Sequence, residues 1–390
     1  MLKLAAGQLA VLAGLLALVD AALWLVAPIS FTQQQVRFTQ DLPGLKPSIR
    51  FTSFASGFRS LTLTDLRKPA NSLRVLCLGA STTNQASQEI EDTWCALLEQ
   101  RLKASHPAWA GAFHTLSFGK GGKRAFDTLL WLNQRIDQVK PDVVITLLGI
   151  NDLSWAGGPG WRARDIDAEI ARQKKASQKE SSGHKTVCLR VSQLCRRVAV
   201  VVAGWQTSKS LDQKSLDQSG QIDWHSSNLP RLKADYRALP AVDAPTREPD
   251  PITEFEAATG RLLALLRERA IATIVLGQPV LWKPEFSQPE FEALWFPVNT
   301  PKGFVRPPGR WLLAEMQRYN RRQQDLAQRH GATFVELDPG IPKSLEYYFD
   351  DCHFTDKGSH AVAGLVLPAL ERVLQSAIAA GVPRQKQSRN

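Results

Sequence analysis

The amino-acid sequence predicts an α/β fold, in which a parallel central sheet is covered by helices on both faces to give three layers. Short, mainly apolar runs recur along the chain, and most are followed by a longer segment whose apolar residues return every three or four positions. The first pattern is typical of strands buried on both faces, and the second of amphipathic helices. Strands that alternate with helices pair in parallel, because each crossover helix carries the chain back to the starting edge of the sheet.

The elements follow one another from residue 71 onward. The run 142–148 (DVVITLL) has the clearest pattern of a central strand. Asp92 is the expected N-cap of the first helix, since its short side chain can accept a hydrogen bond from a first-turn N–H. Strands are expected at 73–79, 114–117, 142–148, 271–276 and 333–337, and helices at 90–102, 126–136, 254–269, 312–328 and 355–379.

One stretch, at about 155–250, interrupts this alternation. It is rich in charged residues, Ser and Gln, contains the duplication KSLDQ-KSLDQ at 209–218, and ends in a Pro-rich segment. Long irregular stretches between regular elements are typical of surface insertions. We therefore expect one domain at 71–380, split by a partly ordered insertion that overhangs the site built by the flanking strands.

The N-terminal segment at 4–27 is almost uniformly apolar and is interrupted only by Gln8 and Asp20. This length is sufficient for a helix to cross the hydrocarbon core of a membrane. A cleaved signal peptide is the alternative, but its apolar region is usually shorter, and no small-x-small cleavage site is clear. We expect an uncleaved, single-pass transmembrane anchor, followed by a juxtamembrane linker at 28–70 with little periodicity.

The formal net charge of +11 does not by itself indicate a nucleic-acid-binding protein. Lys and Arg are scattered over the predicted helices and loops, and no stretch gathers them on a recognisable binding element. A solvated surface that favours acidic polymers or anionic lipid headgroups is the plainer interpretation. A short basic tail at 381–390 contains Arg384, Lys386 and Arg389. No nucleic-acid partner is expected, and the sequence does not indicate a protein partner.

The five cysteines are an odd number spread along a long chain, which does not indicate a disulfide framework. Cys77 and Cys95, in an apolar strand and an amphipathic helix, are expected to be core residues. A bridge between Cys188 and Cys195 is an option if the chain is extracytoplasmic. No Cys or His spacing indicates zinc, and we expect neither a metal nor an organic cofactor.

Four short motifs stand at the ends of predicted strands or at a strand–helix junction. The carboxyl ends of parallel strands meet at one edge of the sheet, where ligands bind, so these motifs are expected to converge. Each motif alone has a plainer interpretation, such as a turn after a strand, an Asx-turn, or a phosphate loop that lacks the GxxxxGKS/T pattern. The motifs are Gly79-Ala80-Ser81-Thr82-Thr83, Gly119-Lys120-Gly121-Gly122, Gly149-Ile150-Asn151-Asp152 and Asp350-Asp351-Cys352-His353.

Together, the motifs contain the groups that a serine nucleophile requires. Ser81 becomes reactive when a base removes its proton, and His353 is the candidate base. Of the seven histidines, His353 has a carboxylate, Asp350, three residues before it at a strand–helix junction. That carboxylate can accept the ring N–H and fix the tautomer. The backbone N–H groups of Ser81 and Gly122 and the side-chain amide of Asn151 are candidate donors to an oxyanion.

The order of these motifs resembles that of the SGNH (GDSL-like) hydrolases. The resemblance covers about 71–153 and 252–378 and is closest to a subgroup with a GxSTT turn followed by a Trp-containing helix, here with Trp94. It implies a flavodoxin-like α/β/α sandwich with a shallow, open site. The roles that it implies are nucleophile for Ser81, base for His353, acid for Asp350, and oxyanion hole for Ser81, Gly122 and Asn151.

Two positions depart from the family pattern, since Ala80 stands for the usual Asp of the GDS motif and Ser117 for an expected Asn. Members of the resembled subgroup are often bacterial envelope or exopolysaccharide proteins. The charges around the apolar segment, Lys3 and Arg37, indicate its orientation only weakly. The expected periplasmic placement of the domain therefore rests partly on the resemblance.

The expected function is hydrolysis of an ester through an acyl-enzyme, with O-acetyl groups on an envelope polysaccharide or exopolysaccharide as the favoured target. An acylated small molecule or glycan is thus the expected substrate. Transfer of the acyl group to a glycan hydroxyl by the same residues is one alternative. A catalytically silent, membrane-anchored scaffold or glycan-binding subunit is the other.

Overall fold

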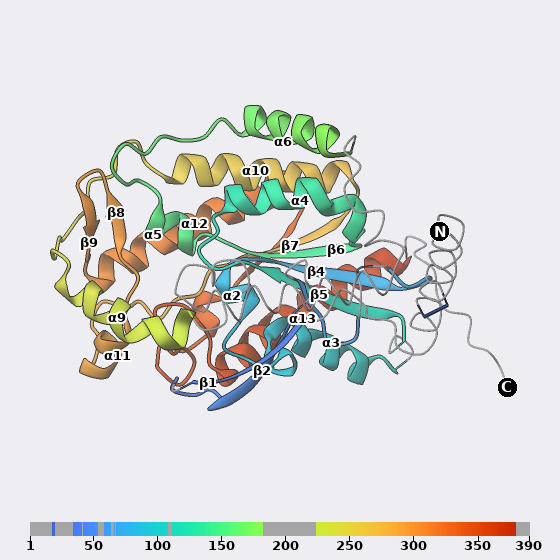
Figure 1. Ribbon diagram of the computed structural model, residues 1–390, viewed down its shortest axis with the longest axis horizontal. Coiled ribbons are helices and arrows are strands. Elements are labelled where there is room, and N and C mark those ends of the chain that lie inside the picture. Colours follow the sequence, from blue (N-terminus) through green and yellow to red (C-terminus); the bar gives the residue numbers. More distant parts are fainter. Residues whose placement is uncertain are drawn as a thin grey trace, which may run out of the picture.

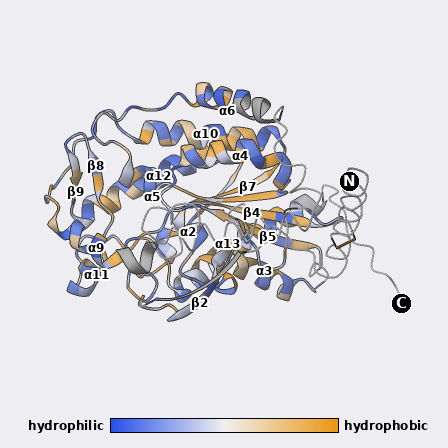
Figure 2. Ribbon diagram, viewed as in Figure 1, coloured by the Kyte–Doolittle hydropathy of each residue, from blue (hydrophilic) through white to orange (hydrophobic). Residues whose placement is uncertain are grey.

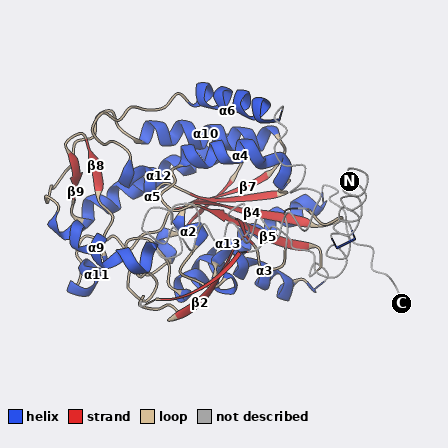
Figure 3. Cartoon of the chain, in the orientation of Figure 1, coloured by secondary structure: helices blue, strands red, loops and turns tan. Residues whose placement is uncertain are grey.

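The computed structural model of the protein describes residues 18–19, 34–40, 42–53, 58–63, 66, 68–107, 111–181 and 224–379. At its centre lies a six-stranded sheet in the order β10-β7-β6-β4-β5-β3 (Figure 1 and Figure 3). The strands are β3 (Phe58–Arg59), β4 (Leu73–Gly79), β5 (Phe113–Gly119), β6 (Val143–Leu147), β7 (Ala272–Gly277) and β10 (Thr333–Glu336).

All pairings in this sheet are parallel except that of β3 with β5. Counted among themselves in chain order, the parallel strands lie in the order 2-1-3-4-5, as in flavodoxin-like sheets. Every residue of β4 and β6 is buried, as continuous apolar strands require when both faces are covered. The predicted α/β fold with a mainly parallel central sheet is confirmed.

Helices cover both faces of the sheet, and Figure 2 shows apolar residues gathered on the central strands. On one face, α10 packs between α4 and α12, and on the other face α3 packs against α13. All five predicted helices are therefore present, with ends that differ by a few residues. Their bounds are α3 (Trp94–Ser105), α4 (Ala125–Val139), α10 (Ile252–Glu268), α12 (Gly309–His330) and α13 (Asp356–Ala379).

The segment at 28–70, predicted to be a linker, is part of the fold where the structure describes it. Strands β1 (Gln34–Thr39) and β2 (Ser48–Ser53) pair antiparallel as a separate two-stranded sheet. Strand β3 then joins the edge of the main sheet. Strand β3 has only two residues, and β1 and β2 each hold only two apolar residues at alternate positions, which is a weak period-two signal.

The described part of the segment predicted to be an insertion, at 155–250, contains two helices. Helix α6 (Ile166–Ser181) packs along α4, and α9 (Trp224–Ala238) lies near the hairpin of β8 and β9 in Figure 1. The residues between these two helices lie outside the described part of the chain. Three short elements between β7 and α12 are not predicted by the sequence: α11 (Gln288–Ala293), β8 (Val298–Thr300) and β9 (Gly303–Val305).

Two local predictions need correction. Cys77 and Cys95 are core residues as expected, but they also form a disulfide that joins β4 to α3. Hydrophobic patterns show that both side chains face the core and do not show that they meet. The N-cap of α3 is Thr93 rather than Asp92, because a 3₁₀ turn (Ile90–Asp92) ends at Asp92, and Thr93 Oγ1 accepts from Ala96 N at 3.4 Å. Cys188 and Cys195 lie outside the described residues.

The predicted anchor at 4–27 lies outside the described residues, apart from Leu18 and Val19. Within the part of the chain that the structure describes, no helix combines the length and the apolar character that crossing a membrane requires.

Asp152, in the short helix α5 (Ile150–Trp155), is a buried carboxyl group that links two elements. Both of its oxygens accept a hydrogen bond from the N–H of Ala125, the first residue of α4, at 3.1 Å. Burial raises the pKa of Asp152 to about 7, and the hydrogen bond from Ala125 offsets this only in part. The folded state therefore holds a proton on this group more tightly than the unfolded chain does.

We expect the free energy of unfolding to fall as the pH rises from about 4 to about 7. In this range the folded protein keeps a proton on Asp152 that the unfolded chain, with a pKa near 3.8, has lost. Asp152→Asn keeps an acceptor for Ala125 and removes the titration. The difference in unfolding free energy between about pH 5 and about pH 8, measured in urea, should therefore shrink by about 1–4 kcal/mol.

The control is Asp167→Asn, at a side chain that is 86% exposed, which should leave the pH dependence unchanged. The pKa of Asp351 is also raised to about 7, by burial and by the charge of Asp350. Its contribution to the pH dependence of the unfolding free energy remains in both variants. A folded Asp152→Asn protein with the full parental pH dependence would contradict the assignment.

Candidate active site

Ser81 is the first residue of the four-residue helix α2 (Ser81–Asn84), which follows β4 without a linker. The turn is closely packed at Gly79, where a Cβ atom would lie 2.2 Å from Thr83 Oγ1 and 2.5 Å from the carbonyl oxygen of Leu147. Only glycine fits such a close approach. The side chain of Ser81 is thus placed at the carboxyl end of β4, beside the end of β6, and is 7% exposed.

His353 and Asp350 lie on the loop that leads into α13, and they meet Ser81 from the far end of the sequence. His353 Nε2 lies 2.7 Å from Ser81 Oγ, and His353 Nδ1 lies 2.7 Å from Asp350 Oδ2. All three side chains are buried. The structure therefore brings the predicted nucleophile, base and acid into one hydrogen-bonded row.

The charge of Asp350 is held by several donors. Oδ1 accepts from the backbone N–H groups of Cys352 at 3.0 Å and His353 at 2.8 Å, and Oδ2 accepts from Trp295 Nε1 at 2.7 Å. Burial alone would raise the pKa of Asp350, but the charge that His353 can carry and these hydrogen bonds hold it well below its usual range. An ionised carboxylate only accepts hydrogen bonds, so His353 carries its proton on Nδ1, and Nε2 is left to accept from Ser81.

Asp351, the other member of the acidic pair, points to a different part of the fold. Its carboxylate accepts from Trp282 Nε1 and from the backbone N–H of Trp295, both at 2.7 Å, and from the N–H of Phe296 at 3.1 Å. It therefore fastens the segment after β7 to the loop that carries His353. The spacing that selects Asp350 as the partner of His353 agrees with this geometry.

Trp295 is a site residue that the sequence does not reveal. Besides its hydrogen bond to Asp350, its ring lies parallel to the imidazole of His353, with 6.2 Å between centroids and 2° between planes. Phe349 stacks on the same imidazole at 5.5 Å. Trp295 lies in the irregular segment between α11 and β8, where no periodicity or motif marks it.

Gly122 lies on the loop after β5, and Asn151 lies in α5, the short helix after β6. Asn151 is buried, its Nδ2 donates to the carbonyl of Lys123 at 2.9 Å, and its Oδ1 accepts from Trp155 Nε1 at 3.1 Å. Gly122, with φ of +70°, directly precedes Lys123. Asn151 is therefore bonded to the loop that carries Gly122, at the residue that follows Gly122. The end of β5 approaches the serine turn at Gly119, where a Cβ would lie 2.3 Å from the carbonyl oxygen of Ala80.

A small cavity that opens to solvent lies beside Ser81. It is lined by Ser81, Thr82 and the segment 85–88, and by Phe349, His353 and Phe354. Gly122 and Asn151 are not among its lining residues. The cavity is thus narrow and combines amide side chains with aromatic rings.

Asp350, Cys352 and His353 bring donor atoms within 4.8 Å of one another, which by residue type could hold a metal ion. Both ring nitrogens of His353 are already hydrogen-bonded, to Asp350 and to Ser81. Burial raises the pKa of the Cys352 thiol well above its usual value, which disfavours the thiolate that a metal requires. The arrangement is suited to moving a proton between serine and histidine.

Comparisons with known proteins bear on the family. Among solved structures, the chain is similar to LAE5, an alpha/beta hydrolase enzyme from the metagenome of Lake Arreo, Spain (16% identity, TM-score 0.39, covering 77% of this chain and 96% of that chain). It is also similar to the acetyl xylan esterase AlAXEase (14%, 0.39, 76% and 100%) and to a catalytic mutant of Axe2, an acetylxylan esterase from Geobacillus stearothermophilus (13%, 0.38, 82% and 100%).

No curated protein matches the chain. The model of the GDSL-like Lipase/Acylhydrolase family matches residues 77–361, well over half of the chain, and this range contains Ser81, Asp350 and His353. The predicted enzyme class, a serine-type carboxylic ester hydrolase, is the class of this family. The chain therefore belongs to the GDSL-like lipase/acylhydrolase family.

Proposed function

We propose that Ser81, His353 and Asp350 are the catalytic triad of this esterase, and that it removes small acyl groups from a glycan. The observation that carries the proposal is the row of hydrogen bonds, 2.7 Å from Ser81 Oγ to His353 Nε2 and 2.7 Å from His353 Nδ1 to Asp350 Oδ2. Serine is a weak nucleophile unless a base of this kind takes its proton during attack.

The reaction follows from this geometry. Ser81 Oγ attacks the ester carbonyl while its proton moves to His353 Nε2, and Asp350 stabilises the imidazolium that forms. His353 then gives the proton to the alcohol oxygen as the ester bond breaks. The alcohol departs, and the acyl group stays bonded to Ser81. Water, activated by the same imidazole, releases the acid and restores the serine.

The negative charge that develops on the carbonyl oxygen requires positioned donors. We assign these to the backbone N–H groups of Ser81 and Gly122 and to Asn151 Nδ2. The amide of Asn151 has two N–H hydrogens, of which one goes to Lys123, while Trp155 holds the amide oxygen. These contacts orient the amide with its nitrogen toward the glycine loop.

The small size of the cavity beside Ser81 supports a short acyl group such as acetyl. The alcohol side of the ester is proposed to be an envelope polysaccharide or exopolysaccharide, on the basis of the resemblance in the motif set. Transfer to a glycan hydroxyl would use the same residues. It would be seen as labelled acetyl moving to an added oligosaccharide rather than to water.

We place the enzyme at the membrane, with the apolar segment at 4–27 as its anchor and the catalytic domain outside the cytoplasm. The disulfide between Cys77 and Cys95 supports this placement, because such bonds persist in oxidising compartments. A phosphatase fused to the C-terminal end of the chain should be active in bacterial cells, and a green fluorescent protein fused there should be dark. The opposite pair of results would place the domain in the cytoplasm.

The activated serine can be tested with a fluorophosphonate probe on the detergent-solubilised full chain. We expect the parent to be labelled, and Ser81→Ala and His353→Ala to lose labelling and about 10⁴-fold or more of their activity toward p-nitrophenyl acetate. Ser376→Ala, at an exposed serine of α13, is the matched control and should be labelled like the parent. Undiminished esterase activity of folded Ser81→Ala would overturn the assignment.

Trp295→Phe tests the support of the triad. An aromatic ring is kept at this position, but the indole N–H that donates to Asp350 Oδ2 is lost. A hydrogen bond to a charged group contributes about 1.5–3 kcal/mol. We expect kcat to fall by about tenfold or more with little change in KM, because Trp295 acts on Asp350 and His353 rather than on the substrate. Trp311→Phe, at a half-buried position of α12, is the control. An unchanged kcat in folded Trp295→Phe would contradict this role.

A further inference from the structure

The loop at 85–88 determines the shape of the cavity beside Ser81. It follows α2 directly, and all four of its residues line the cavity, together with Phe349 and Phe354. Its first residue, Gln85, has a φ of +48°, so the chain turns sharply there. A small movement of this loop would widen or close the space next to the nucleophile.

The side chain of Arg59, in β3, holds this loop by hydrogen bonds to main-chain carbonyl groups. The side chain is fully buried, and Nη1 donates to the carbonyls of Asn84 at 2.5 Å and Gln85 at 2.7 Å, while Nη2 donates to that of Gln88 at 2.7 Å. Its Nε donates to the carbonyl of Thr52 at 3.2 Å. Burial lowers the pKa of Arg59 to about 9. A buried cation is retained at a desolvation cost, and here its planar fork bridges the last carbonyl of α2 and two carbonyls of the loop.

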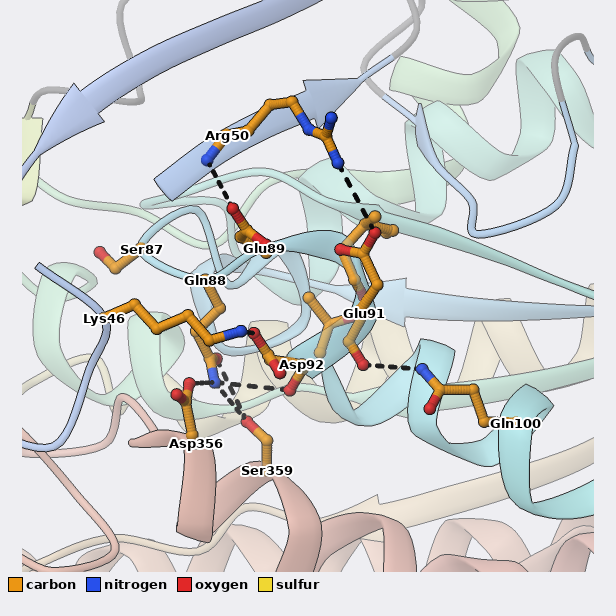
Figure 4. A network of polar contacts seen from close by, with 12 residues as sticks. Lys46, Arg50, Ser87, Gln88, Glu89, Glu91, Asp92, Gln100, Asp356 and Ser359 are labelled. Carbon is orange, nitrogen blue, oxygen red and sulfur yellow. Dashed lines mark hydrogen bonds and ion pairs between the residues drawn. The ribbon is translucent and has the colours of Figure 1, made fainter. Parts of the chain in front are cut away.

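Other residues of the same N-terminal segment hold the loop and the chain after it. Gln40 Nε2 donates to the carbonyl of Ser87 at 2.8 Å. The N–H of Arg50 donates to Glu89 Oε1 at 3.1 Å, and Lys46 Nζ pairs with Asp92 at 2.5 Å (Figure 4). Contacts from 40–59 therefore run along the whole stretch from Asn84 to Asp92.

The loop is fastened on its other side to α13, the helix that follows His353. Gln88 Nε2 donates to Asp356 Oδ1 at 2.9 Å and to Ser359 Oγ at 3.0 Å (Figure 4). Gln85 Nε2 donates to Ser359 Oγ at 2.5 Å. The loop is thus held between the N-terminal segment and the helix that begins three residues after the base.

We infer that the described residues of this segment, 40, 42–53 and 58–59, are a specificity-determining part of the active site. In this part Arg59 is a positioning residue that keeps the loop at 85–88 closed against long acyl chains. The inference rests on the proposed function, because it takes the cavity beside Ser81 as the site of the acyl group. The segment precedes the residues that match the family model, which begin at 77, so the family match does not account for it.

The test compares p-nitrophenyl acetate, butyrate and octanoate as substrates of the full chain. The parent should prefer acetate. In Arg59→Met the three contacts to the carbonyls of Asn84, Gln85 and Gln88 are lost, so kcat/KM for acetate should fall. The octanoate-to-acetate ratio should rise by about tenfold or more, as expected when a pocket no longer excludes extra methylenes. Arg59→Lys restores the charge without the fork and should give a smaller rise.

Arg74→Met is the matched control. Arg74 is also fully buried and donates to backbone carbonyls, those of Leu66 at 2.9 Å and Val139 at 2.5 Å, but it lies at the opposite end of β4 from Ser81. Its loss should lower stability and leave the octanoate-to-acetate ratio within about twofold of the parental value. Hydrogen exchange of the amides at 84–92 should accelerate in Arg59→Met and not in Arg74→Met.

Two further outcomes separate this inference from the proposed function. A folded Arg59→Met protein with the parental ratio and the parental exchange at 84–92 would overturn the inference while the esterase assignment stands. A parent that hydrolyses no ester and takes up no fluorophosphonate would overturn both. If Arg59→Met does not fold, Gln40→Ala, which removes one contact to Ser87, decides the matter together with Arg59→Lys. An unchanged ratio in both would overturn the inference.

Discussion

The geometry around Ser81 depends on the buried negative charge of Asp350. A buried carboxylate costs several kcal/mol unless hydrogen bonds replace the water that it loses. Here the backbone N–H groups of Cys352 and His353, the indole of Trp295 and the imidazole itself all donate to it. The ring proton is therefore held on Nδ1, and Nε2 faces Ser81 as an acceptor. The rings of Trp295 and Phe349 lie nearly parallel to the imidazole and hold it in this orientation.

The serine side of the site is held by a second set of buried contacts. The turn at Gly79 is pressed against the end of β6, and the loop after α2 is fastened by Arg59 through main-chain carbonyls. The side chains of Gln85 and Gln88, which also line the cavity, fasten the other side of this loop to α13.

Much of the architecture can be predicted from the sequence, because it depends on local patterns. The apolar runs at 73–79 and 142–148 require burial on both faces, and the alternation with helices requires parallel pairing. The pairing of Asp350 with His353 is also local, since three residues separate them within one loop. That Ser81 meets His353 follows from a general property of parallel sheets, whose carboxyl ends share one edge.

The sequence by itself therefore determined the fold class, the order of the strands along the chain, and the residues that form the row from Ser81 to Asp350. Only the tertiary structure decided which other residues support that row. Trp295 and Arg59 act across long separations in sequence, and both lie in short or irregular segments with no periodicity. Their partners are a carboxylate and main-chain carbonyls that folding brings near, so no local sequence pattern predicts these contacts. Because such contacts depend on three-dimensional packing, a segment predicted to be a linker became part of the site.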